Sequence, residues 1–165
     1  MRMTLKKLAA AFLASVCLLP AASAYADTTT SDMTVSMNIA AYCTISSPPS
    51  LDFGSVTDLV TEHTAQATIP VNCSSGSSYK LIADNGANYD AVNSIRRMSD
   101  GNDYISYSVY TDSAYSNAFP TTQAQATSMA GSGTVQNIPV YAKVSGQALP
   151  PVGSYTDTIT LTINY

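Results

Sequence analysis

The feature that most constrains the fold is an alternation of apolar and polar side chains with a period of two residues. It is clearest in the last eleven residues, YTDTITLTINY (155–165), where apolar residues occupy alternate positions at Tyr155, Ile159, Leu161, Ile163 and Tyr165. This period is typical of a β-strand with one buried face. Because the apolar face continues to Tyr165, we ask which part of the molecule covers it and which strand pairs with its edge.

Other segments follow a similar strand pattern, and the chain is rich in Thr, Ser, Tyr and Val, which favours strands over long helices. They are residues 33–39, 51–56, 65–73, 78–84, 103–112 and 134–144. Turn-forming pairs such as Asn85-Gly86 and Asp100-Gly101 lie between them. About seven short strands around one core predict an all-β protein, an immunoglobulin-like sandwich.

Some segments are expected to depart from regular strand pairing. Pro70 lacks an N–H group, which places it at an edge or a bulge. Residues 121–131 are polar and are expected to form a loop, and Arg96-Arg97 is expected on a solvated loop face rather than in an anion site. If residues 33–39 leave the body, the sandwich is one strand short, and no residues follow Tyr165 to supply it.

The N-terminus has the three parts of a secretory signal peptide. Arg2, Lys6 and Lys7 precede an apolar run at residues 8–20, and Ala24-Tyr25-Ala26 supplies small residues for cleavage after Ala26. We therefore expect residues 1–26 to be a signal peptide and the mature chain to begin at Asp27. Four of the seven basic residues remain against eleven acidic ones, so the mature net charge is about −7, and nucleic acid is not an expected partner.

The mature chain contains two cysteines, Cys43 and Cys73. In an exported protein an even pair most simply forms one disulfide, with two free thiols as the alternative. A bridge at this separation is worth about 3–4 kcal/mol in the chain-entropy model.

The residues for catalysis or metal binding are missing from the sequence. His63 is the single histidine, and no serine lies in a G-x-S-x-G elbow. One histidine and two paired cysteines do not provide a common zinc site, and no phosphate-binding glycine motif precedes a helix. We expect no catalytic, cofactor-binding or metal-binding residues, and no enzyme. The tyrosines are expected mainly in packing, with an exposed sugar-binding face as the alternative.

Taken in order, the segments resemble the spore coat protein U family, which includes the pilins of archaic chaperone–usher fimbriae. The matching pieces run from an alternating strand and YCTI through LDFGSV, ATIPVNC, YKLIADNGAN and ISYSVYTD to GSGTVQNIPVYAKV and PVGSYTDTITLTINY. They cover nearly all of the mature chain in the family's order and spacing.

The resemblance implies an immunoglobulin-like sandwich that lacks its last strand, which a donor strand from another chain completes. It implies three parts: the signal peptide at 1–26, an N-terminal donor extension at 27–39 and a pilin domain at 40–165. In this arrangement the donor side chains are Met33, Val35, Met37 and Ile39. The acceptor groove and chaperone-binding edge comprise Ile159, Leu161, Ile163 and Tyr165.

The implied function is that of a structural subunit of a surface fimbria that polymerises by donor-strand exchange, with a role in adhesion and biofilm formation. The implied partners are a periplasmic chaperone, an outer-membrane usher and other pilin subunits in a head-to-tail homopolymer or heteropolymer. No cofactor, metal or nucleic acid is implied. Export would run through the periplasm to the cell surface. The alternative is a secreted or spore-coat surface protein, or a lectin-like binding module.

Overall fold

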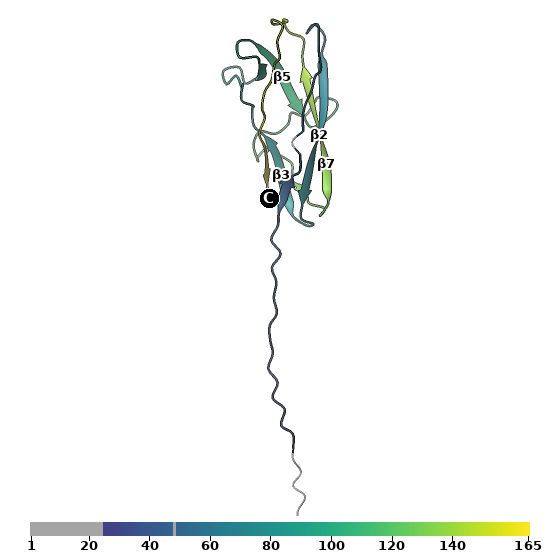
Figure 1. Ribbon diagram of the computed structural model, residues 1–165, viewed down its shortest axis with the longest axis vertical. Coiled ribbons are helices and arrows are strands. Elements are labelled where there is room, and N and C mark those ends of the chain that lie inside the picture. The colour runs from purple at the N-terminus through teal and green to yellow at the C-terminus, as the bar shows by residue number, and fades with distance from the viewer. Residues whose placement is uncertain (1–24, 48) are drawn as a thin grey trace, which may run out of the picture. The chain divides into compact units, whose positions relative to one another are not determined.

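The computed structural model describes residues 25–47 and 49–165, and the part of the chain after Met37 forms an all-β body (Figure 1). The signal peptide expected at residues 1–26 therefore lies almost wholly outside the described residues. The described residues form eight strands, all paired antiparallel. They are β1 (Cys43–Ile45), β2 (His63–Cys73), β3 (Ser78–Ala83), β4 (Arg96–Ser99), β5 (Tyr104–Tyr110), β6 (Met129–Ala130), β7 (Val135–Val144) and β8 (Leu161–Asn164).

The chain divides after Met37 into two units. In the first, residues 25–37 contain no helix or strand. The side chains of Met33, Val35 and Met37 are 84%, 84% and 90% exposed. Three large apolar side chains at alternate positions are thus left in contact with solvent.

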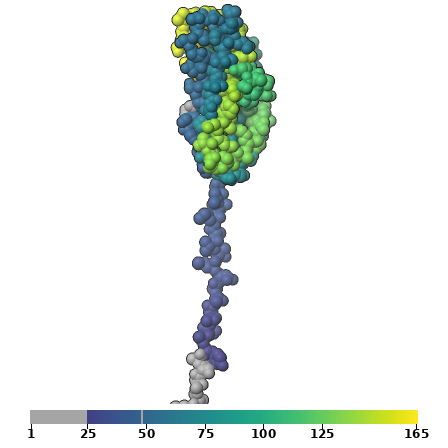
Figure 2. Space-filling model, turned by 90° about the vertical axis from the view of Figure 1, so that its right-hand side faces the viewer, coloured from purple at the N-terminus to yellow at the C-terminus, as the bar shows by residue number. Residues whose placement is uncertain are grey.

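The larger sheet has the strand order β1-β2-β7-β5-β4. Its centre is a long ladder in which residues 63–72 of β2 pair with residues 135–144 of β7. These two strands lie side by side across one face of the body (Figure 2). Alternation then sends Ile69 and Val71 of β2, and Val140 of β7, into the core, where each is at most 4% exposed.

The smaller sheet has the order β6-β3-β8. Residues 161–164 of β8 pair with residues 80–83 of β3, which places the C-terminal end of the chain beside β3 (Figure 1). The residues preceding β8 reach the larger sheet through an isolated bridge between Thr156 and Ser99 of β4. The terminal segment (residues 155–165) therefore contacts both sheets.

The core lies between the two sheets, as expected for a sandwich. Its most buried large side chains are Ile69, Val71, Cys73 and Tyr79, each at most 1% exposed. They come from β2 and β3, one strand from each sheet, and thus join the two layers. The predicted all-β sandwich is confirmed.

Most of the expected strands are present, and 103–112 is the clearest case. Its central part forms β5, where Ile105, Tyr107 and Val109 share the buried face with exposures of 8%, 6% and 3%. Residues 121–131 form a loop except for the two residues of β6.

Three expectations about secondary structure are wrong, and the first is the strand at residues 33–39, which the structure leaves unpaired. Residues 51–56 form no strand despite their composition, because no strand pairs with them. Arg96 and Arg97 begin β4 instead of lying in a loop. Arg96 donates to the carbonyl of Asp84 at 2.7 Å, and Arg97 pairs with Asp90 at 3.1 Å. Backbone pairing with β5 thus determines this segment more than its charge does.

Pro70 lies in an interior strand rather than in an edge strand. Its carbonyl accepts a hydrogen bond from the N–H of Ser46 at 3.1 Å, immediately after β1 ends at Ile45. Because N–H and C=O of one strand residue point to the same side, the missing N–H of Pro70 faces the place where the β1 ladder stops. The proline therefore marks the end of a pairing within the sheet.

Candidate functional site: an apolar groove between the sheets

A groove with a volume of about 1090 Å³ opens between the two sheets. That is near the upper limit of about 1,000 Å³ for small-molecule pockets. Its floor consists of core side chains from both sheets. They include Ile69, Ala83, Ile105, Tyr107, Val109, Phe119, Val140 and Val144. The groove thus extends down to the buried side chains of the hydrophobic core.

One wall of the groove is the terminal segment, which is paired on one side. The carbonyls of Thr158 and Thr160 accept from the N–H groups of Ala87 and Asp84 at 3.0 Å and 2.9 Å, and Thr156 bonds to Ser99. Successive residues of a strand direct their N–H and C=O groups to opposite sides. The main-chain groups of the odd-numbered residues 157–163 therefore point to the other side, along the free edge beside the groove.

The opposite wall is the segment from Pro49 to Val56. Leu51 and Phe53 are half-buried against the core, although the segment forms no strand. A turn in which the Asp52 carboxylate accepts from the Gly54 N–H at 2.8 Å interrupts it, and Gly54 has a φ of +72°. The groove is therefore bordered by the free edge of the terminal segment and by a segment that belongs to neither sheet.

A polar group lies within this apolar lining. The Tyr107 hydroxyl donates to Asp157 Oδ2 at 2.6 Å, and the Asn88 N–H and Nδ2 donate to Asp157 Oδ1 at 3.0 Å and 3.2 Å. Gly86 has a φ of +87°, and a Cβ there would overlap with the Asp157 carboxylate, so a larger residue would strain the backbone and displace Asp157. Burial, together with the neighbouring Asp157 carboxylate, raises the pKa of Tyr107 well above its usual value of 10. The network fixes the terminal segment against β5.

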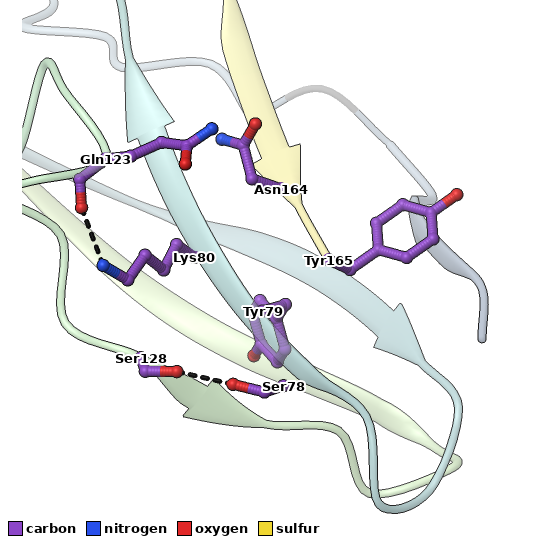
Figure 3. A pocket seen from close by; sticks show the side chains of 7 residues that line it. All are labelled: Ser78, Tyr79, Lys80, Gln123, Ser128, Asn164 and Tyr165. Atoms are coloured by element: carbon purple, nitrogen blue, oxygen red, sulfur yellow. Dashed lines mark hydrogen bonds between the residues drawn. The ribbon is translucent and has the colours of Figure 1, made fainter.

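A second, smaller pocket of about 250 Å³ lies at the Asn164 end of β8. Figure 3 shows the side chains that line it: Ser78, Tyr79, Lys80, Gln123, Ser128, Asn164 and Tyr165. Lys80 Nζ donates to the Gln123 carbonyl at 2.8 Å, and the hydroxyls of Ser78 and Ser128 bond at 2.6 Å. Each of these side chains carries a polar group, whereas most of the side chains that line the groove are aliphatic or aromatic.

The predicted disulfide is confirmed, because Cys43 and Cys73 are bonded. The bridge joins the first residue of β1 to the last residue of β2, which are register partners. Since β1 has only three residues, the covalent bond supplements a short ladder at the edge of the larger sheet.

The four residues predicted for the acceptor edge divide into two pairs. Ile159 and Leu161 line the groove. Ile163 packs against the core beyond the groove, and Tyr165 is 63% exposed and lines the smaller pocket. Of the predicted donor residues, Ile39 is as exposed as Met33, at 84%.

Sequence reasoning missed two parts of the groove. The sequence pattern predicts a strand at residues 51–56, whereas this segment forms a wall of the groove. Asp157 was passed over, although it occupies an apolar-face position between Tyr155 and Ile159. A charged residue on an otherwise apolar strand face signals a buried partner, and here that partner is Tyr107.

Among the residues that the structure describes, no group of three or more His, Cys, Asp or Glu side chains could hold a metal ion. His63 Nε2 lies 2.9 Å from the main-chain oxygen of Asp58. The described part of the chain also contains no apolar helix of membrane-spanning length.

Comparisons with known proteins agree with this architecture. The family model of the Spore Coat Protein U domain matches residues 29–162, and the chain belongs to that family. No curated protein matches the sequence significantly.

Among solved structures, the chain is similar to a chain in the crystal structure of the CsuC–CsuE chaperone–tip adhesion subunit pre-assembly complex from the archaic chaperone–usher Csu pili of Acinetobacter baumannii. The TM-score is 0.55 at 19% identity, and the match covers 77% of this chain and 40% of the other. This chain therefore spans less than half the length of the protein it matches, and the likeness concerns the fold.

Proposed function

We propose that this protein is a structural subunit of a chaperone–usher surface fimbria and that it polymerises by accepting a strand from another chain. The observation that carries this proposal is the apolar groove beside the unpaired edge of the terminal segment. Membership of the spore coat protein U family supports it. In this role the protein is a structural component and not an enzyme.

The incoming strand performs two tasks in this proposal. Its main chain pairs with the free edge at residues 157–163, which is strand addition to a sheet. Its apolar side chains fill the groove and cover half-buried lining residues such as Phe53, Ile159 and Leu161. An open groove of this size leaves the core incompletely covered until the strand arrives, and an unpaired apolar edge favours wrong association.

We assign the incoming strand to the N-terminal segment of another subunit, residues 27–39. Met33, Val35, Met37 and Ile39 lie on one face of an extended chain and are 84–90% exposed. Burying four such side chains contributes about 6–12 kcal/mol before ordering costs. This is comparable to the whole stability of a small domain. Because donor and acceptor are different parts of each subunit, the contact does not close and builds a filament.

The partners follow from the same groove. A periplasmic chaperone would occupy it before assembly, and an outer-membrane usher would exchange the chaperone for the next subunit on the way to the cell surface. The structurally similar complex pairs a chaperone with a tip adhesion subunit. We extend the proposal to a role of the assembled fimbria in adhesion and biofilm formation.

The test uses the mature chain, residues 27–165, with one charge added to the donor segment. Val35→Asp or Met37→Asp places a carboxylate in the groove and should prevent fibre formation, seen by electron microscopy and by the loss of denaturant-resistant polymer. Ser36→Asp adds the same charge on the opposite face and should still polymerise. Fibres from Val35→Asp at the wild-type yield would refute the donor assignment.

A further inference from the structure

The small pocket at the end of β8 contains an unusual lysine. Only four basic residues belong to the body, and among the described residues the ion pairs are those of Arg97 with Asp90 and of Lys143 with Glu62. Arg96 is held by the carbonyls of Ala83 and Asp84. Lys80, in contrast, has a single hydrogen-bond partner, the Gln123 carbonyl. In a protein with a net charge of about −7, its ammonium remains available to an acid.

Next to Lys80 lies a hydrogen-bond donor without a partner. Asn164 Nδ2 is buried and makes no hydrogen bond. Figure 3 shows the Asn164 and Gln123 side chains pointing toward one another, with their amide nitrogens at the facing ends. A buried donor that lacks a partner requires an explanation. Rotating either amide would let the two pair while the pocket is empty, and rotating the Asn164 side chain toward the free edge would let Nδ2 donate to an incoming carboxylate.

The sheet register places this pocket in line with the free edge. Lys80 and Asn164 are direct partners across β3 and β8, so both side chains lie on the outer face of the smaller sheet. A strand added to the free edge would place one of its side chains directly opposite Asn164, on that same face. Lys80, Asn164 and this residue would form one row across three strands.

The donor segment offers one acid at the right position. Suppose that the donor segment runs antiparallel to β8 with Val35 opposite Leu161. Met33 then lies opposite Ile163, and Met37 lies opposite Ile159. The residue opposite Asn164 is then Asp32. Ile39 lies opposite Asp157, whose carboxylate is already bonded to Tyr107 and Asn88. In an antiparallel ladder, hydrogen-bonded pairs of residues alternate with non-hydrogen-bonded pairs, and the latter lie closer together. Because the odd-numbered residues of the terminal segment make the hydrogen bonds at the free edge, residues 32 and 164 form a non-hydrogen-bonded pair with close side chains.

The charges at the two ends of the free edge also favour the antiparallel direction. In the parallel orientation Asp32 would lie at the other end of the groove, near Asp157 and Asp100. Gly153, which follows the groove-lining Val152, approaches the Asp100 carboxylate there. One end of the edge is acidic, and the other contains Lys80.

We propose that the Lys80–Asn164 pocket binds the Asp32 carboxylate of a second copy of this chain and thereby sets the direction and register of the incoming strand. This inference rests on the proposed strand exchange and specifies its geometry. Asp32 accepts hydrogen bonds from Asn164 Nδ2 and from Lys80.

Cysteine pairs in the full mature chain test the register first. Thr34→Cys is combined in turn with Thr158→Cys, Thr160→Cys or Thr162→Cys, all at exposed positions. The expected result is an intermolecular disulfide mainly between positions 34 and 162. A dominant bond to position 158 or 160 would overturn the register and leave strand exchange intact. No intermolecular bond from any of the pairs would refute strand exchange itself.

Charge variants then test the pocket. Asp32→Asn or Lys80→Gln should accelerate dissociation of the polymer about 2–5-fold, as expected for a partly exposed ion pair, and added salt should reduce the difference. Asp32→Lys and Lys80→Asp should each weaken the polymer, and the double variant should restore it. Asp27→Asn makes the same charge change outside the paired residues and serves as the control. Equal effects of Asp27→Asn and Asp32→Asn, or no rescue by the double variant, would overturn the assignment.

Discussion

The strand β5 and the terminal segment have the same sequence pattern but different surroundings. In β5, which pairs with β4 and β7, Ile105, Tyr107 and Val109 are at most 8% exposed. In the terminal segment, Ile159 and Leu161 occupy equivalent alternate positions and are only half-buried.

The difference teaches that alternation determines which face of a strand is apolar, whereas the neighbouring strands determine how deeply that face is buried. β5 has its neighbours within the body. The terminal segment has one side paired with residues 80–99 and the other side open to the groove. A half-buried apolar strand at the mouth of a groove is thus the structural sign of a missing neighbour.

The largest expected effect comes from placing a carboxylate on each strand. Val109→Asp puts an unpaired charge at the bottom of the groove, where Val109 is only 3% exposed, and should cost about 4 kcal/mol or more. Leu161→Asp reaches the open groove and should cost only about 1–2 kcal/mol in the monomer. Urea denaturation of the monomers measures both. If the two variants are equally destabilised, the terminal segment is buried as deeply as β5.

Leu161→Asp also tests whether the open side of the terminal segment is covered in the polymer. Its folded monomers should fail to polymerise, because the incoming strand would bury the new charge. Sedimentation after incubation at high protein concentration checks this, with Thr162→Asp on the opposite face as the control.

The disulfide should have the next largest effect. Replacing Cys43 and Cys73 together by serine should lower the free energy of unfolding by about 2–4 kcal/mol. The loss of stability should be largest at β1 in the larger sheet, because β1 pairs with β2 through three register pairs only. Hydrogen exchange of β1, compared with that of β3, shows whether the effect is local; uniform loss of protection would mean that the bridge stabilises both sheets alike.

Tyr107→Phe removes a contact that joins the two compared strands. The hydroxyl donates to the Asp157 carboxylate, and hydrogen bonds to charged groups are worth about 1.5–3 kcal/mol. Asp157 keeps its bonds to Asn88, so we expect a loss toward the lower value, measured by urea denaturation. Tyr104→Phe, on the exposed side of the same strand, should leave stability within about 0.5 kcal/mol of the wild type.

The smallest effect is a pH dependence in alkaline solution. The folded-state pKa of Tyr107 is raised by burial and by Asp157, whereas the unfolded chain has a pKa of about 10. Above pH 10 the unfolded state releases its proton first, so stability falls as the pH rises, by at most about 1.4 kcal/mol per pH unit for this group. Wild type should lose more stability than Tyr107→Phe between pH 9 and 11; parallel curves would contradict this.

Much of the fold could be predicted, because in most segments the residues that alternation marks as apolar are the ones that the folded body buries. The period-two alternation of residues 103–112 and the even number of cysteines led to β5 and to the Cys43–Cys73 bond. Residues 51–56 were predicted wrongly, because strand propensity does not reveal whether a partner strand exists. Arg96 and Arg97 were misplaced since their backbone pairing with β5 outweighs their charge.

The site was predictable in part for the same reason. Alternation in the terminal segment predicts an apolar face that includes Ile159 and Leu161, and the family resemblance places a groove beside that face; both residues line the groove. It could not separate them from Ile163, because the boundary between the groove and the closed core depends on residues distant in sequence. The Lys80–Asn164 pocket likewise depends on the register of β3 with β8, which no local pattern encodes.

The disulfide has a mechanical consequence. Cys43 is the first residue of the body's first strand, so tension applied through the N-terminal segment reaches the body at this point. The covalent link to Cys73 passes that load directly to β2, which is joined to β7 through ten register pairs. The three-residue strand β1 therefore does not have to bear the pull, and a chain of such subunits would transmit force through its longest ladder.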